Sequence, residues 1–217
     1  MKIIRLAILA GLLITFILTI AMYLAVPETV VSYWNAAGEA DGYMSKLWGL
    51  SLIPLIMTGF VALLAVLPRI DPYKKNYEKF GEYYEGFILL FVFFMLAIQV
   101  QIILWSSGYQ ISPNLTFPFL IGTLFIYIGF LLGHAEQNWF VGIRTPWTLS
   151  SKTVWKKTHE LGGTLFKIAG VIAFAGVLAE RYAIWFILVP ALAVGVVTVL
   201  YSYFEYQKEV KSQEERS

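Results

Sequence analysis

The chain contains no cysteine, and only 14% of its residues are charged. The absence of cysteine excludes disulfide bonds and thiolate metal sites, and it leaves the redox compartment open. The scarcity of charge, together with 59% hydrophobic residues and a mean hydropathy of +0.70, excludes an ordinary soluble domain of this length. The sequence therefore predicts an integral membrane protein.

Six continuous apolar stretches are long enough to cross a hydrocarbon core of about 30 Å as helices that rise about 1.5 Å per residue. They lack the alternation of membrane β-strands, which excludes a β-barrel. The first stretch exceeds the apolar region of a usual signal peptide, and we interpret it as a retained anchor. The predicted fold is an all-α integral membrane protein with six transmembrane helices, over residues 6–26, 47–67, 86–105, 117–133, 161–179 and 183–203.

Lysine and arginine are distributed unevenly between the loops, and such cations accumulate on the cytoplasmic side of membrane proteins. With an inner N-terminus only Lys46 and Arg181 fall outside, and Lys167 lies within a span. The charges therefore predict an N-in, C-in topology. The cations placed inside are Lys2, Arg5, Arg69, Lys74, Lys75, Lys79, Arg144, Lys152, Lys156, Lys157, Lys208, Lys211 and Arg216.

The spans divide into two predicted modules and a tail. Residues 1–105 form an N-terminal membrane module whose outer loop is 27–46, and residues 106–204 form a second module whose inner loop is 134–160. Residues 205–217 are a cytoplasmic tail. Small residues at spacings of four, three and four on the last two spans predict that these two helices pack closely; they include Ala169, Ala173, Gly176, Ala191 and Gly195.

The inner segment 68–85 mixes four cations with four acids and several aromatic residues. The pattern predicts a helix lying on the inner headgroups. Because the opposite charges cancel the field that nucleic-acid binding needs, we expect no direct nucleic-acid partner.

The most distinctive stretch is the polar, aromatic and basic run 142–153, which continues to His159. Gly142 and Pro146 restrict the backbone around Arg144, so the guanidinium is presented from a shaped turn. Ser150 or Ser151 is placed to cap a helix, with Lys152, Lys156 and Lys157 directed to phosphates or water. A basic re-entry helix with an aromatic anchor explains the cations and tryptophans, but Gly142-Ile-Arg-Thr-Pro-Trp-Thr148 is denser than anchoring requires.

The run from Asn138 to Gly163 resembles the signature of the SdpI family, membrane immunity proteins against a secreted toxin. The outer loop resembles the uncharacterised module that commonly precedes this signature, whereas His134 departs from the asparagine expected there. The resemblance implies a six-span protein that binds a membrane-active peptide toxin outside and relays to a small cytoplasmic autorepressor. The implied candidates in the inner loop are Asn138, Gly142, Arg144, Thr145, Pro146, Trp147, Thr148, Trp155, Thr158, His159 and Gly162, and those in the outer loop are Pro27, Trp34, Asn35, Gly38, Asp41 and Gly42. The outer aromatic residues equally fit an interfacial belt.

Catalysis and metal binding are not expected. His134, Glu136, His159 and Glu160 share one loop, but a second histidine at metalloprotease spacing after His159 is missing. We therefore predict no enzyme, no cofactor and no metal, with the lipid bilayer as a partner.

Lys167 is the one cation inside a span, and such residues are functional candidates. Its position near the cytoplasmic end also allows its amine to snorkel to the interface. An alternative hypothesis is a small-solute or ion-coupled transporter with a polar relay of Arg144, Glu160 and Lys167.

Overall fold

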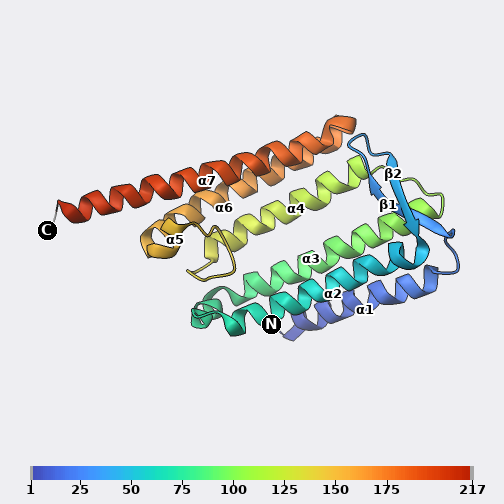
Figure 1. Ribbon diagram of the computed structural model, residues 1–217, viewed down its shortest axis with the longest axis horizontal. Helices are drawn as coiled ribbons and strands as arrows, with labels where there is room; N and C mark the ends of the chain where they lie inside the picture. The colour runs from blue at the N-terminus through green and yellow to red at the C-terminus, as the bar shows by residue number, and fades with distance from the viewer. Residues whose placement is uncertain (1, 216–217) are drawn as a thin grey trace.

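The computed structural model describes residues 2–215, most of which lie in long helices that run side by side (Figure 1). Five helical stretches in this part of the chain are long and apolar enough to cross a membrane, and the last, residues 152–214, turns back on itself. The elements are α1 (Lys2–Met22), β1 (Thr29–Trp34), β2 (Ala40–Ser45), α2 (Lys46–Ile70), η1 (Lys74–Asn76), α3 (Tyr77–Ser106), α4 (Pro113–His134), α5 (Pro146–Ser150), α6 (Lys152–Ala175), η2 (Gly176–Tyr182) and α7 (Ala183–Glu214). The helical membrane fold is confirmed, whereas the helix ends differ from those predicted.

Local chemistry sets several of these ends. Ser112 caps α4 by accepting a hydrogen bond from the Asn114 amide, with Pro113 at the first helical position. Ser151 caps α6 by accepting from the Val154 amide at 3.2 Å. Between α6 and α7 the chain reverses in η2, where Glu180 has a φ of 43°. The fifth predicted span therefore ends in this turn.

The outer loop departs from the all-helical prediction, because it folds into an antiparallel hairpin of β1 and β2 in which Thr29 lies opposite Ser45. The Asn35 side chain closes the turn by accepting hydrogen bonds from the Ala37 and Glu39 amides. Val30 and Val31 are buried against α2 and α3. The hairpin is thus held against the helices by its apolar face. The hydropathy of the sequence did not reveal that its two strands pair.

Segment 68–85 also differs from its prediction of a separate surface helix. It forms the end of α2, the short η1 and the first turns of α3, which is kinked at Phe80. Tyr77, Phe80 and Tyr84 are buried in the core between the first three helices. The prediction was wrong because these aromatic residues pack against protein instead of headgroups.

Helices α4 and α6 approach each other most closely through glycine. A Cβ on Gly129 would lie 2.5 Å from the Gly163 carbonyl oxygen, and a Cβ on Gly170 would lie 2.6 Å from that of Gly122. The small stripe predicted on the last span is partly wrong, because Gly195 is exposed.

Different connections between the helices lie at the two ends of the bundle. The hairpin, the α3–α4 connection and η2 lie at one end, whereas η1, α5 and both ends of the described chain lie at the other (Figure 1). Helix α7 extends beyond its neighbours at this second end. Loops predicted to share a side of the membrane therefore share an end of the molecule.

Candidate functional site

The loop between α4 and α6, residues 135–151, is called the signature loop below. It is closed on itself by Asn138, which is fully buried. Its side-chain oxygen accepts from the amides of Phe140 at 2.9 Å and Val141 at 2.6 Å. Its side-chain nitrogen donates to the carbonyls of Glu136 and Val141, both at 2.9 Å. Asn138 therefore acts as the internal support of this loop.

The first half of the chain anchors the same loop. The Asp71 carboxylate, at the end of α2, accepts from the Trp139 amide at 2.9 Å. The Tyr77 hydroxyl, at the start of α3, lies 3.2 Å from both the Asp71 carboxylate and the Asn138 oxygen. Since Asp71 and Tyr77 are buried, these contacts join α2 and α3 to the signature loop in a protected setting.

His159 is buried beneath the loop as a neutral imidazole with both nitrogens occupied. Its Nδ1 lies 2.8 Å from the Trp155 carbonyl, which only accepts, so Nδ1 carries the proton. Its Nε2 accepts from the Ile143 amide at 3.0 Å. Gly142 has a φ of +110°, and a Cβ there would lie 2.3 Å from Nε2. Glycine is therefore required at this position for two reasons, backbone conformation and space.

A capping box organises the turn that follows Arg144. Thr145 and Thr148 exchange hydrogen bonds between side chain and backbone at the start of α5. The Thr145 hydroxyl also donates to Ser202 of α7 at 3.0 Å. Gln137 donates to the carbonyls of Thr148 and Leu149. The loop is thus tied to α7 as well as to α3.

The aromatic and small residues of α6 complete the support. The Trp155 indole donates to the Ala135 carbonyl at 2.8 Å and stacks on His159 with 3.9 Å between ring centroids. Gly162 makes room for Ile143, because a Cβ there would lie 2.4 Å from its Cδ1. Thr158 is also buried. These candidates hold the loop and do not present free side chains.

Three of the predicted inner candidates reach the surface. Arg144 is exposed, and its guanidinium donates to the Trp139 carbonyl at 2.9 Å, which directs it without neutralising it. Pro146 is exposed beside it. Trp147 is half-buried and packs edge-on against Tyr203 of α7 at 5.1 Å. Trp139, which the sequence did not single out, is 48% exposed and lies next to Arg144 through its carbonyl.

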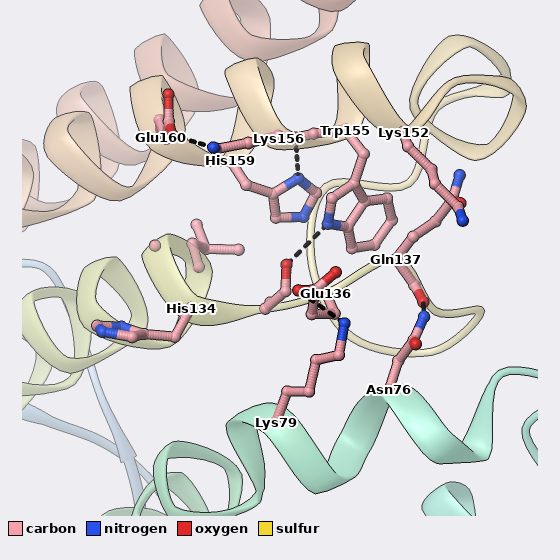
Figure 2. Close-up of a pocket in the computed structure, with 13 residues that line it drawn as sticks. Asn76, Lys79, His134, Glu136, Gln137, Lys152, Trp155, Lys156, His159 and Glu160 are labelled. Carbon is pink, nitrogen blue, oxygen red and sulfur yellow. Dashed lines mark hydrogen bonds and ion pairs between the residues drawn. The ribbon is translucent and has the colours of Figure 1, made fainter.

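A polar cleft of about 330 Å³ opens at the same end of the bundle, and we call it the inner cleft (Figure 2). Lys79 reaches across it from α3 to Glu136 at 3.3 Å, and Asn76 donates to the Gln137 carbonyl at 2.6 Å. The wall opposite α3 is the first part of α6. The lining residues are Asn76, Lys79, Leu132, Gly133, His134, Ala135, Glu136, Gln137, Lys152, Trp155, Lys156, His159 and Glu160.

The outer-loop candidates divide into supports and exposed positions. Trp34 packs edge-on against Trp105 at 5.6 Å and Phe117 at 5.8 Å, and its indole nitrogen is buried without a hydrogen-bond partner among residues 2–215. Asn35 forms the turn, and Gly38 contacts Asn114 of α4, whose side chain donates to the Ala36 carbonyl at 3.4 Å. Gly42 lies against the Tyr33 ring. Pro27 and Asp41 are exposed.

Lys167 lies on the seam between α4 and α6, with its amine 4.3 Å from the centre of the Phe130 ring. Arg144 and Glu160 make their own contacts, with Trp139 and Lys156 respectively. No hydrogen bond or ion pair within residues 2–215 joins Arg144, Glu160 and Lys167 into the relay considered above.

The two histidines lie in different surroundings. His134 is exposed and stacks on Tyr83 at 3.8 Å, whereas both nitrogens of His159 are used internally. The described part of the chain holds no cluster of three or more histidine, cysteine, aspartate or glutamate residues suited to a metal ion.

Several functional supports were missed by the sequence interpretation. Asp71 and Tyr77 were grouped with a surface segment, and nothing in the sequence marked them as supports of the loop. Lys157 was expected to face phosphates or water, but it pairs with Glu205 of α7 at 2.7 Å. Glu205 also pairs with Lys208 at 2.7 Å, so α6 and α7 are joined here by an ionic contact.

Comparison with known proteins places this geometry in context. The model of the SdpI/YfhL protein family matches residues 134–203, and that of a domain of unknown function, DUF1648, matches residues 10–58. The chain is 28% identical over 196 residues to "Immunity protein SdpI" of Bacillus subtilis (strain 168), which covers 90% of this chain and 92% of that protein. No solved structure matches the chain. The resemblance to the SdpI family is confirmed, and the chain is a multi-pass protein of the cell membrane.

Proposed function

We propose that this SdpI-like chain is a membrane immunity and signalling protein that binds a secreted membrane-active peptide toxin at its hairpin end. Binding is relayed to the signature loop, which engages a small cytoplasmic autorepressor. The chain crosses the membrane six times, since α6 and α7 count separately, with both termini inside. The role is one of binding, without catalysis.

The observation that carries this proposal is that α3 contacts both the hairpin and the signature loop. At the hairpin end, Ser106 of α3 accepts a hydrogen bond from the Val31 amide at 3.4 Å, and Trp105 packs on Trp34. At the opposite end, Tyr77 of α3 contacts Asn138 in the signature loop. At about 1.5 Å per residue the 30 residues of α3 span about 45 Å, so one continuous element, kinked at Phe80, reaches from the hairpin to the loop.

The group offered to the inner partner is Arg144 with its neighbour Trp139. Arginine and tryptophan are enriched among the residues that dominate protein interfaces. The Trp139 carbonyl holds the guanidinium, while the Trp139 amide is fixed by Asp71. A shift of α3 or of the end of α2 would therefore move this pair directly.

The proposal is tested in Bacillus subtilis cells that lack their own immunity protein SdpI and are exposed to the toxin. We expect the native chain to restore survival and to bring a fluorescently tagged repressor to the membrane. Arg144→Ala should abolish the recruitment without unfolding the bundle, because the residue is exposed. Lys75→Ala, which removes another exposed cation at the same end, is the matched control. Unchanged resistance and recruitment in the Arg144 variant would refute the proposal.

The transport hypothesis makes a different demand. It requires Lys167 to act within the membrane, so Lys167→Met should stop solute flux in proteoliposomes, whereas Lys167→Arg should retain part of it. Normal flux through the methionine variant would leave Lys167 as a snorkelling residue on the α4–α6 seam.

A further inference from the structure

We infer that the inner cleft is a binding site for an anionic phospholipid whose headgroup carries hydroxyl groups, such as phosphatidylglycerol. The inference does not depend on toxin immunity, because it uses only the cleft and its place in the membrane. The cleft lies where the apolar stretches of three helices begin or end. Asn76 and Lys79 precede the third apolar stretch, Leu132 and Gly133 end the fourth, and residues 152–160 precede the fifth. All three walls therefore lie at the level where hydrocarbon gives way to headgroups.

The cations of the cleft are available to a phosphate. Lys152 is exposed and has no ion pair among residues 2–215. Lys156 lies 4.0 Å from Glu160, and those side chains are 79% and 59% exposed. Exposed pairs of this kind contribute little to stability, so both amines can turn to a phosphate at small cost. Basic pockets between helices on the inner side of membranes bind such headgroups.

The acids of the cleft favour one kind of headgroup. Three lysines and the carboxylates of Glu136 and Glu160 line the cleft. Its net charge of one positive matches the single negative charge of a phosphodiester. The carboxylate oxygens are also acceptors for hydroxyl groups, which a glycerol headgroup supplies and a choline headgroup lacks. The same acids disfavour a multiply charged soluble anion.

A lipid also needs a surface for its acyl chains, and the exposed face of α4 beside the α4–α6 seam provides one. Gly133 is exposed at the mouth of the cleft, and a Cβ built on it meets no atom within 4 Å. Phe130, one turn deeper on α4, is 44% exposed. Lys167 lies over its ring, on the same face of α6 as Lys156 and Glu160 at steps of four and seven residues. Because its amine lies over Phe130, one turn from Gly133, it is placed to approach a phosphate in the cleft from the hydrocarbon side.

The test uses the purified full-length chain in detergent, with bound lipid counted by native mass spectrometry during titration with phosphatidylglycerol. Lys152→Gln/Lys156→Gln should weaken retention about thirtyfold (about 2 kcal/mol), since each lysine near an anionic headgroup contributes about 1 kcal/mol. Lys74→Gln/Lys75→Gln removes the same charge from exposed positions outside the cleft and should leave retention unchanged. Thermal unfolding of both variants checks that each is folded.

Three outcomes would overturn the inference. Equal loss in the two double variants would mean that general surface charge is responsible. Equal retention of phosphatidylethanolamine or phosphatidylcholine would mean that the cleft does not select an anionic headgroup. Full displacement of phosphatidylglycerol by millimolar inorganic phosphate would mean that the cleft is a site for a soluble anion.

Discussion

At the scale of single residues, the signature loop uses its polar side chains mainly to hold itself together. Asn138, Thr148 and His159 are buried, and each is fully engaged with nearby backbone groups. Buried polar groups of this kind are costly when one partner is removed, because the other is left unsatisfied. Such residues shape the loop, whereas the exposed Arg144 and Trp139 are side chains that a partner can reach.

Gly142→Ala tests this account of the loop. The substitution places a side chain at a positive φ and displaces the His159 ring, which should lower the free energy of unfolding by about 2 kcal/mol or more. Thermal unfolding in detergent and proteolysis of residues 138–146 measure the effect. Gly59→Ala is the control, since Gly59 lies exposed within α2 with no atom within 4 Å of an added Cβ; an equal response in the two variants would contradict the account.

At the scale of elements, the close contact of α4 and α6 decides how the second half of the chain packs. Two glycines on each helix, seven residues apart, bring the backbones together at Gly122–Gly170 and Gly129–Gly163. In lipid, such close approach replaces the hydrophobic driving force between helices. The sequence instead predicted close packing between the last two spans. A stripe of small residues does not show which helix it packs against until the partner helix is known.

Gly163→Ala is the corresponding prediction. Its Cβ would lie 2.7 Å from the Gly129 carbonyl oxygen, which belongs to backbone and cannot rotate away. We expect a loss of about 1–3 kcal/mol from overpacking, measured by unfolding in mixed micelles. Gly195→Ala, on the exposed face of α7, should leave stability nearly unchanged. A smaller loss at Gly163 than at Gly195 would show that the seam is not tightly packed.

At the scale of the whole molecule, the hairpin and the signature loop lie at opposite ends and are joined by α3 (Figure 1). The anchors at its two ends, Ser106 with Val31 and Tyr77 with Asn138, come from segments far apart in the chain. The proposed function uses this arrangement, with toxin binding at the hairpin end and repressor binding at the loop end. It also predicts which positions are reached from each side of the membrane.

The native chain has no cysteine, so single cysteines report this topology directly. Ala37→Cys, in the exposed hairpin turn, should react with a membrane-impermeant maleimide in intact cells. Ser150→Cys, exposed at the end of α5, should react only after permeabilisation. Reversed labelling would overturn the N-in, C-in orientation, and labelling of both from one side would contradict the separation of the two ends.

The sequence by itself determined the membrane location, the helical character and the place of the signature loop, because these depend on local hydropathy and on charges close together in the chain. Arg216, counted among the inner cations, lies outside the described residues. Only the tertiary structure decided which loop residues are supports. The partners that bury them, Asp71, Tyr77 and Ser202, come from other helices and carry no mark of their role in the sequence. The hairpin and the α4–α6 seam were likewise decided by contacts between distant segments, because hydropathy alone does not distinguish a helix face that meets protein from one that meets lipid.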